Sequence, residues 1–377
     1  MTLHAFDPHA FLRDYWQKKP LLIRGALKDW VNSLDPDELA GLACEEGVES
    51  RLIMRGGSGW TLEQGPFGED RFGQLGDLPW TLLVQAVNHH VPEVAALLDP
   101  FRFVPNWRVD DVMVSYASDR GGVGPHFDRY DVFLVQGLGR RRWRVGQHCD
   151  AGTPLLPHDD LKLLAHFETT DEWILEPGDI LYVPPGVAHD GEAVGDDCMT
   201  YSIGFRAPAR AELVAHWCDH LLEDMADDDL YADPDLKAQA NPGEISPSAV
   251  AGLQAMVMEA FGDTAAFARW FGTYNSRPKY PEVDWRPEEP VTQAEVRAWV
   301  ADGLPLRRNP ASRFSFVRTE EGVMLFVDGE NFDCAGAASG LAQALCVGDI
   351  DEVPEDDEAI RLVTALVNQG SAAFDQE

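Results

Sequence analysis

The pattern of hydrophobic and polar positions changes along the chain, and the first hundred residues are mixed in character. An amphipathic stretch near the N-terminus predicts a helix that leads into a short strand at Leu21–Arg24. Apolar residues recur at helical spacing over Thr81–Leu98, which predicts a second helix there. This part of the chain therefore fits a mixed α+β arrangement.

From about Asp111 the pattern consists of short apolar runs of strand length, interrupted by glycine and proline. The sequences GLG, EPGD and PPG form turns, and they separate the runs. Several short strands at such spacing are typical of a β-sandwich or barrel. The predicted strands lie in VMVSYAS, YDVFLVQ, RRWRVG, EWILEPGDILYVPP and MTYSIGFR.

After Pro208 the apolar residues return to helical spacing, at i, i+3 and i+4. Helical stretches are predicted over residues 209–228 and 247–274, and their apolar stripe is too pronounced for helices that stand alone. The stripe can pack on the barrel or on its twin in a dimer, and the pattern leaves this choice open. The proline-rich stretch Arg277–Pro290 is predicted to be a linker.

The last part of the chain predicts a small unit of helices and strands. Helices are expected at Thr292–Ala301 and near Asp356–Val367, around a two-stranded element formed by Arg313–Val317 and Gly322–Val327. Helix, hairpin and helix in this order suggest a winged-helix-like unit. The changes of pattern predict three domains, with the boundaries 1–207, 208–280 and 281–377.

Composition and charge narrow the class of partner. The chain has 377 residues, 45% of them hydrophobic, which is too long for one ordinary domain and sufficient for real cores. The formal net charge is −34, with 18 basic against 32 acidic residues over 1–207 and 12 against 32 over 208–377. Both parts repel a phosphate backbone and attract a basic partner. Direct binding of nucleic acid is therefore not expected, although the same charge can serve solubility alone.

The cellular compartment is predicted from the absence of membrane-spanning, signal and paired-cysteine patterns in the sequence. It contains no apolar run of membrane-spanning length, and its N-terminus has no basic segment followed by an apolar run. The six cysteines include no CxxC pair, which favours reduced thiols over a disulfide framework or a cysteine zinc site. We expect a cytoplasmic protein without a membrane partner.

Candidate chemistry concentrates in the segment GGVGPHFDRYDVFLVQGLGRRRWRVG, residues 121–146. On a strand, residues two apart point to the same side, so His126 and Asp128 are expected to project together. One imidazole and one carboxylate can occupy two adjacent positions of a metal ion. An HxD pair alone is weak evidence, because a loop histidine beside a turn-capping aspartate has the same sequence.

A third ligand is offered by His189, which follows a predicted strand and the proline-rich turn of YVPPGVAH. Two histidines and one carboxylate form the facial triad of non-haem iron oxygenases, which leaves three coordination positions free. Zinc bound by the same ligand types is the chemical alternative.

The arginine run after the GLG turn contains a further candidate. Strand alternation places Arg141 on the same face as Trp143 and Val145, opposite the other arginines of the run. An arginine buried beside apolar side chains requires an anion. A dicarboxylate can supply it through a bidentate pair, and an internal ion pair with an aspartate or glutamate is the alternative.

Taken together, HFD, the basic residue Arg141 thirteen positions after Asp128, and the distal VPPGVAH resemble the JmjC-type 2-oxoglutarate oxygenases. The sequence is more similar still to the bacterial ribosomal oxygenases, through WRVDDVMVSYA, LEPGDILYVPPGVAH and the N-terminal YWQKKPLLIRGAL. This resemblance covers nearly the whole chain. It is specific over residues 105–206 and loose after 280.

The resemblance implies a fold, a set of cofactors and a site. The fold is a double-stranded β-helix (a cupin or JmjC jelly roll) followed by a helical dimerisation region and a C-terminal winged-helix-like domain. Fe(II) is expected on His126, Asp128 and His189. The cosubstrate 2-oxoglutarate is expected on Arg141, which is a lysine in many JmjC relatives, and on Ser115; O₂ is the third reactant.

The resemblance also implies the reaction, which is β-hydroxylation of an arginine of the large-subunit ribosomal protein sixteen by a homodimer. A guanidinium substrate needs carboxylates near the metal, and Asp119, Asp131 and Asp190 flank the ligand segments without any one being singled out. Two other functions stay open at this point. One is a cupin-type isomerase or hydrolase with zinc or manganese, and the other is a non-catalytic module that binds a basic peptide around a structural metal.

Overall fold

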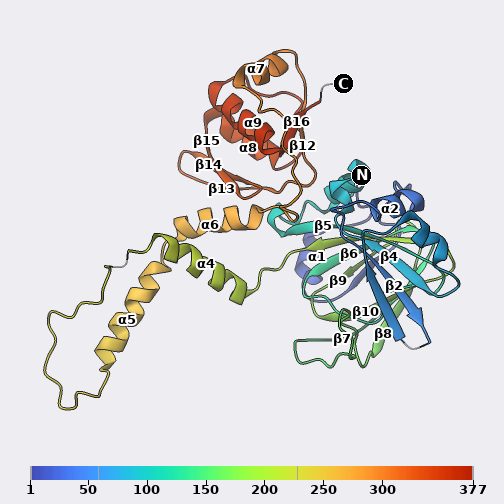
Figure 1. Cartoon of the computed structure of the whole chain (residues 1–377), viewed down its shortest axis with the longest axis horizontal. Helices are drawn as coiled ribbons and strands as arrows, with labels where there is room; N and C mark the ends of the chain where they lie inside the picture. The colour runs from blue at the N-terminus through green and yellow to red at the C-terminus, as the bar shows by residue number, and fades with distance from the viewer. Residues whose placement is uncertain (1, 58, 227, 376–377) are drawn as a thin grey trace. The chain divides into compact units, whose positions relative to one another are not determined.

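The computed structural model describes residues 2–57, 59–226 and 228–375, which fall into two units (Figure 1). Each unit has a hydrophobic core of its own. The first unit runs to Ala207 and also includes Lys279–Trp285 and Arg308–Ala311. The remaining residues form the second unit.

Two antiparallel sheets form the first unit. The large sheet has the strand order β1-β9-β6-β11-β5-β4-β2-β3, and the small sheet has the order β10-β7-β8. The strands of the large sheet are β1 (Leu21–Ile23), β2 (Ser50–Gly56), β3 (Gly59–Gln64), β4 (Trp80–Val84), β5 (Val109–Ala117), β6 (Asp131–Leu138), β9 (Ile180–Val183) and β11 (Cys198–Phe205). Those of the small sheet are β7 (Arg141–His148), β8 (Thr169–Leu175) and β10 (Val187–Ala193).

An apolar cluster joins the two sheets. Val132 of β6 and Leu181 of β9 pack with Trp143 and Val145 of β7. Alternate residues of each strand point into this interior, because successive side chains on a strand face opposite ways. The intervening residues of the large sheet, such as Phe133, are buried on its other face in the main core. The interior between the sheets is the space in which a site can be built.

Short helices cover the outer face of the large sheet. They are α1 (Pro8–Asp14), α2 (Pro36–Leu42) and α3 (Pro92–Ala95), with the 3₁₀ segments η1 (Glu69–Gln74), η2 (Val87–His89), η3 (Ala96–Phe101) and η4 (Asn106–Arg108). The Asp7 carboxylate accepts hydrogen bonds from the first turn of α1, and Asp35 forms a capping box with Glu38 at the start of α2. These caps supply partners for N–H groups that a helix leaves unpaired, so both helices begin where the sequence provides an aspartate before a proline.

The predicted strand at the N-terminus is confirmed as β1, but the helix predicted over Thr81–Leu98 is wrong. Its first residues form β4, and only short helical segments follow. Four of the five β4 residues are buried, so the strand shows no alternation of polar and apolar positions. A short apolar run of this kind fits a helical template equally well. The sequence pattern also missed the neighbouring strands β2 and β3.

The second unit begins with three helices, α4 (Arg210–Asp224), α5 (Pro247–Ala260) and α6 (Thr264–Ser276). The single stretch predicted over 247–274 is divided, because Asp263 caps a new helix by accepting hydrogen bonds from Ala265 N and Ala266 N. None of the α5 residues is buried. In the described part of the chain, no helix is long and apolar enough to cross a membrane.

The C-terminal part of the second unit combines helices and two small sheets. The predicted two-stranded element has a third strand, and α8 was not predicted. The elements are α7 (Gln293–Ala301), β12 (Leu306–Arg308), β13 (Phe314–Arg318), β14 (Gly322–Val327), β15 (Glu330–Ala335), α8 (Gly336–Leu345), α9 (Asp357–Gln369) and β16 (Ala372–Phe374). The sheets are β13-β14-β15 and β12-β16, and they share one apolar core with α8 and α9.

The predicted linker Arg277–Pro290 contains no helix or strand, but part of it is held firmly by the first unit. Lys279 Nζ lies 3.0 Å from a carboxylate oxygen of Asp110 and 2.8 Å from one of Asp111. The Asp111 side chain is only 3% exposed, so it requires this cation. The segment around Lys279 is therefore part of the folded first unit.

Candidate metal centre

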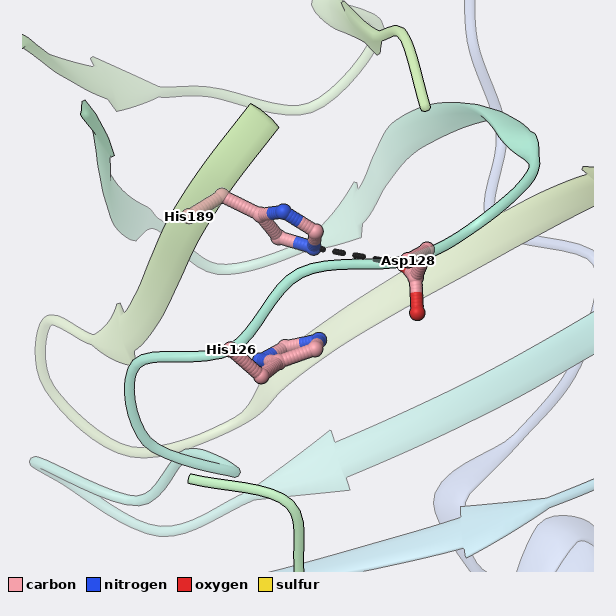
Figure 2. A group of neighbouring side chains, drawn as sticks. All are labelled: His126, Asp128 and His189. Carbon is pink, nitrogen blue, oxygen red and sulfur yellow. Dashed lines mark ion pairs between the residues drawn. The ribbon is translucent and has the colours of Figure 1, made fainter. Parts of the chain in front are cut away.

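The three side chains singled out in the sequence as ligands lie together at one end of the interior between the sheets. Each of His126, Asp128 and His189 offers one ligand atom, and these atoms all lie within 4.8 Å of one another. His189 Nε2 is 3.5 Å from Asp128 Oδ2 (Figure 2). Among the described residues this is the sole group of three or more histidine, cysteine and acidic side chains with metal-binding geometry.

The expectation that His126 and Asp128 share a strand is wrong. They lie on one continuous loop that precedes β6, while His189 belongs to β10 (Figure 2). The loop is attached to β10 at one point, where His126 N donates to His189 O over 3.0 Å and His189 N donates to His126 O over 2.8 Å. The two imidazole rings are brought within 4.3 Å of each other by this bridge, centroid to centroid.

Backbone carbonyls orient both imidazoles. His126 Nδ1 lies 2.8 Å from Gly124 O, and His189 Nδ1 lies 3.0 Å from Val187 O. A ring nitrogen that faces a carbonyl carries the proton, so Nε2 of each ring keeps its lone pair for a metal. Gly124 has φ +93°, a conformation that favours glycine and lets its carbonyl face His126.

The electrostatics keep His189 neutral. Burial of its side chain, which is 2% exposed, and the neighbouring His126 together lower the pKa of His189 to about 4, against the opposing effect of Asp128. A neutral imidazole is the form that binds a metal. Tyr130, which the sequence did not point to, is 43% exposed and donates a hydrogen bond to Asp128. Partial removal of its hydroxyl from water and the adjacent carboxylate raise the pKa of that hydroxyl.

Arg141 lies in the interior as strand alternation predicts, and is 3% exposed. Its Nε donates to Cys198 Sγ over 3.4 Å, and its guanidinium carbon is 5.8 Å from the centre of the Trp143 ring. No described residue offers its buried Nη2 an acceptor. Leaving such a group unpaired costs roughly 1–3 kcal/mol or more, so the position is suited to an external anion.

The other two arginines of β7, unlike Arg141, form ion pairs with acidic side chains. Arg142 pairs with Glu172 and Glu192, and Arg144 pairs with Asp190, all on the outer face of the small sheet. The internal ion pair considered for Arg141 is therefore absent from the described residues, while its neighbours have one. A dicarboxylate with one end at the metal fits the remaining donors.

Ser115 belongs to a row of buried polar side chains on the same interior. Its Oγ donates to Thr200 O over 3.5 Å, and Thr200 Oγ1 donates to Gln136 Oε1 over 3.2 Å. Ser115 and Thr200 are paired across β5 and β11. Ser115 thus lies on the inward face as expected, and its contact with a cosubstrate stays a prediction.

The three flanking aspartates are engaged elsewhere. Asp131 is fully buried, where it accepts from Tyr182 Oη over 2.6 Å and pairs with Arg108. Asp119 accepts from Gly195 N, and Asp190 pairs with Arg144 on the outer face. Asp131 in particular is a core residue and is not available to a substrate.

Fold and donor set together define a class of enzyme. A jelly roll that combines a two-histidine, one-carboxylate triad with an unpaired buried arginine is the arrangement of the JmjC-type oxygenases, which use Fe(II), 2-oxoglutarate and O₂. When bound, the iron and the cosubstrate supply the activation of O₂, and the chain holds and orients the reactants.

Comparison with known proteins narrows this class to a family. Residues 96–213 match a JmjC domain and residues 259–373 match a ROXA-like winged helix. The chain is 39% identical over 376 residues to the ribosomal protein uL16 3-hydroxylase of Escherichia coli, covering 97% of each protein. It is 44% identical over 209 residues to a probable ribosomal oxygenase of Haemophilus influenzae, covering 55% of this chain and 51% of that protein. The chain belongs to the family of ribosomal oxygenases.

Solved structures of a ribosomal oxygenase match this chain over nearly its whole length. The X-ray structure of E. coli ycfD matches with a TM-score of 0.89 at 36% identity, covering 100% of both chains. A structure of YcfD with cobalt and 2-oxoglutarate matches with a TM-score of 0.88 at 35% identity, covering 99% of both. The predicted jelly roll and C-terminal winged-helix-like domain are thereby confirmed. Membership of an oxygenase family decides against the isomerase, hydrolase and binding-module alternatives.

Proposed function

We propose that this chain hydroxylates the β-carbon (C3) of an arginine in ribosomal protein uL16, the large-subunit ribosomal protein sixteen. The observation that carries the proposal is the near full-length similarity to the E. coli uL16 3-hydroxylase. The site supports it, because a facial triad leaves coordination positions for cosubstrate and O₂.

We assign the site residues as follows. His126, Asp128 and His189 hold the iron, each with the ligand atom placed toward the others. Arg141 binds the far carboxylate of 2-oxoglutarate through its unpaired Nη2, and Ser115 lines the same interior. The two Nδ1 contacts with backbone carbonyls keep the imidazoles in the metal-binding tautomer.

The charge of the chain supports a basic protein as its partner. A formal net charge of −34 attracts a basic ribosomal protein and repels the phosphates of RNA. The enzyme is therefore expected to take its substrate as protein, without binding nucleic acid directly, in the cytoplasm where ribosomal proteins are made.

We further propose a homodimer formed by the helical region 208–280, between a catalytic domain over 1–207 and a winged-helix-like domain over 281–377. The support lies in α5, where Val250, Leu253 and Val257 are 53%, 44% and 59% exposed. These residues share one face of the helix, since they are spaced i, i+3 and i+7. An apolar face of this kind is stabilised by a second copy of the same helix.

The test is mass spectrometry of ribosomal proteins incubated with the purified enzyme, Fe(II), ascorbate and 2-oxoglutarate, beside an Asp128→Ala control. We expect one uL16 arginine peptide to gain one oxygen with the native enzyme and none with the control. Succinate formation without any protein gaining mass would keep the oxygenase chemistry and overturn the substrate. Absence of succinate with iron shown to be bound would overturn the oxygenase activity itself.

A further inference from the structure

Trp143 separates the metal-binding end of the interior from Arg141. Its ring centre lies 5.8 Å from the guanidinium carbon of Arg141 and 5.9 Å from the ring centre of His189. The residue is 5% exposed. The indole is therefore within reach of a molecule that extends from the triad to Arg141.

The backbone of β10 leaves room for the indole at one position. A Cβ atom at Gly191, which is paired with Trp143 across the ladder, would lie 2.6 Å from the ring. Glycine allows the benzenoid edge of the ring to lie against the strand. The benzenoid edge of the indole thus faces β10, and any residue other than glycine at position 191 would displace it.

The indole N–H has no acceptor within the part of the chain that the structure describes. Buried tryptophan N–H groups are normally paired, so an unpaired one indicates an acceptor that the chain does not itself provide. Arg141 Nη2 is also buried without a hydrogen-bond acceptor, and Arg141 lies two residues earlier on the same face of β7. Two unpaired donors, one cationic and one neutral, therefore face the same interior.

We propose that Trp143 is a cosubstrate-binding residue, whose indole N–H donates a hydrogen bond to the carboxylate of 2-oxoglutarate that Arg141 binds. A carboxylate has two oxygens and accepts from both donors at once. This inference rests on the proposed function only in requiring 2-oxoglutarate as the cosubstrate. In this arrangement Arg141 neutralises the charge, and Trp143 fixes the direction of the carboxylate.

The experiment measures cosubstrate binding without turnover. The full chain is loaded with Mn(II) and titrated with N-oxalylglycine, a 2-oxoglutarate analogue, by calorimetry. We expect Trp143→Phe to weaken N-oxalylglycine on the order of tenfold, as for loss of a hydrogen bond to a charged group. Mn(II) affinity, measured separately, should not change. Trp173→Phe is the matched control, because Trp173 pairs with Trp143 across β7 and β8 and packs in the same apolar cluster.

A second variant separates the N–H from the packing of the ring. Placing β-(3-benzothienyl)alanine at position 143 exchanges the N–H for sulfur and keeps the ring size, so it decides the question if Trp143→Phe fails to fold. Unchanged N-oxalylglycine affinity in a folded position-143 variant would overturn the inference. Failure of the native enzyme to bind N-oxalylglycine would instead overturn the cosubstrate, and with it the proposed function.

Discussion

At the scale of the residue, the candidate site depends on groups whose hydrogen-bonding partners are already determined by the backbone. The Nδ1 atoms of His126 and His189 face the carbonyls of Gly124 and Val187, which leaves Nε2 of each ring for a metal. Asp128 completes the set from the same loop as His126. The backbone therefore orients both imidazoles for metal binding.

Removal of one ligand should abolish tight metal binding. We expect Asp128→Ala or His189→Ala to lower Fe(II) or Mn(II) affinity by more than about 100-fold, beyond the effect of losing an outer partner. Anaerobic calorimetry measures this directly. His166→Ala serves as the control, since His166 is exposed and outside the cluster. Retention of native metal affinity by the Asp128 variant would contradict the assignment.

Arg141 should show opposite effects on stability and on cosubstrate binding. Arg141→Met removes a buried cation that has no carboxylate partner in the described chain, so we expect the melting temperature of the metal-free protein to rise or stay level. The KM for 2-oxoglutarate should increase by about 10- to 100-fold, the effect of losing a charged hydrogen bond.

Arg142→Met is the matched control for that experiment, because Arg142 lies on the opposite face of the same strand with Glu172 and Glu192. It should leave the KM for 2-oxoglutarate unchanged. An equal increase in both variants would show that the effect comes from the strand and not from an anion at Arg141.

At the scale of the element, α5 differs from every other α-helix described above in having no buried residue of its own. We expect Val257→Asp to convert a dimer into a monomer, because it places a charge within the apolar face. Ala255→Asp adds the same charge on the opposite side of the helix and should leave the dimer intact. Sedimentation velocity distinguishes the two states, and a dimeric Val257→Asp protein would remove α5 from the interface.

The segment around Lys279 behaves as part of the first unit, despite its linker-like sequence. Lys279→Ala leaves Asp111, whose side chain is 3% exposed, without its cation. We expect a loss of about 3–5 kcal/mol in the free energy of unfolding, typical of removing one partner of a buried ion pair. Urea unfolding followed by fluorescence measures this, with Lys162→Ala, at an exposed position, as the control. A loss no larger than the control's would show that the ion pair is dispensable.

At the scale of the whole molecule, the net charge of −34 should govern how fast a basic substrate is captured. Raising the salt concentration from about 50 mM to about 300 mM should raise the KM for uL16 several-fold, because it screens long-range attraction. The KM for 2-oxoglutarate, which binds in the buried interior, should change little. A KM for uL16 that is independent of salt would show that the acidity serves solubility instead.

Features that depend on residue type and on short spacing could be predicted from the sequence. The N-terminal helix and β1, the C-terminal helices α7 and α9, and most strands after Asp111 were predictable, because their apolar periodicity or their caps are local. The same was true of the three candidate ligands and of the inward face of Arg141. A site made of two imidazoles, a carboxylate and a single inward-facing arginine can be predicted before any fold is known.

The folded structure alone established the features that depend on partners distant in the chain. It showed that β4 is a strand. The sequence could not predict this, because both faces of the strand are buried and polar and apolar positions do not alternate along it. The structure placed His126 and Asp128 on a loop, brought to His189 by a bridge across 63 positions, and made Asp131 a core residue. It also left the N–H of Trp143 without an acceptor. Hydrogen-bond satisfaction and burial are properties of non-local contacts, which no local pattern records.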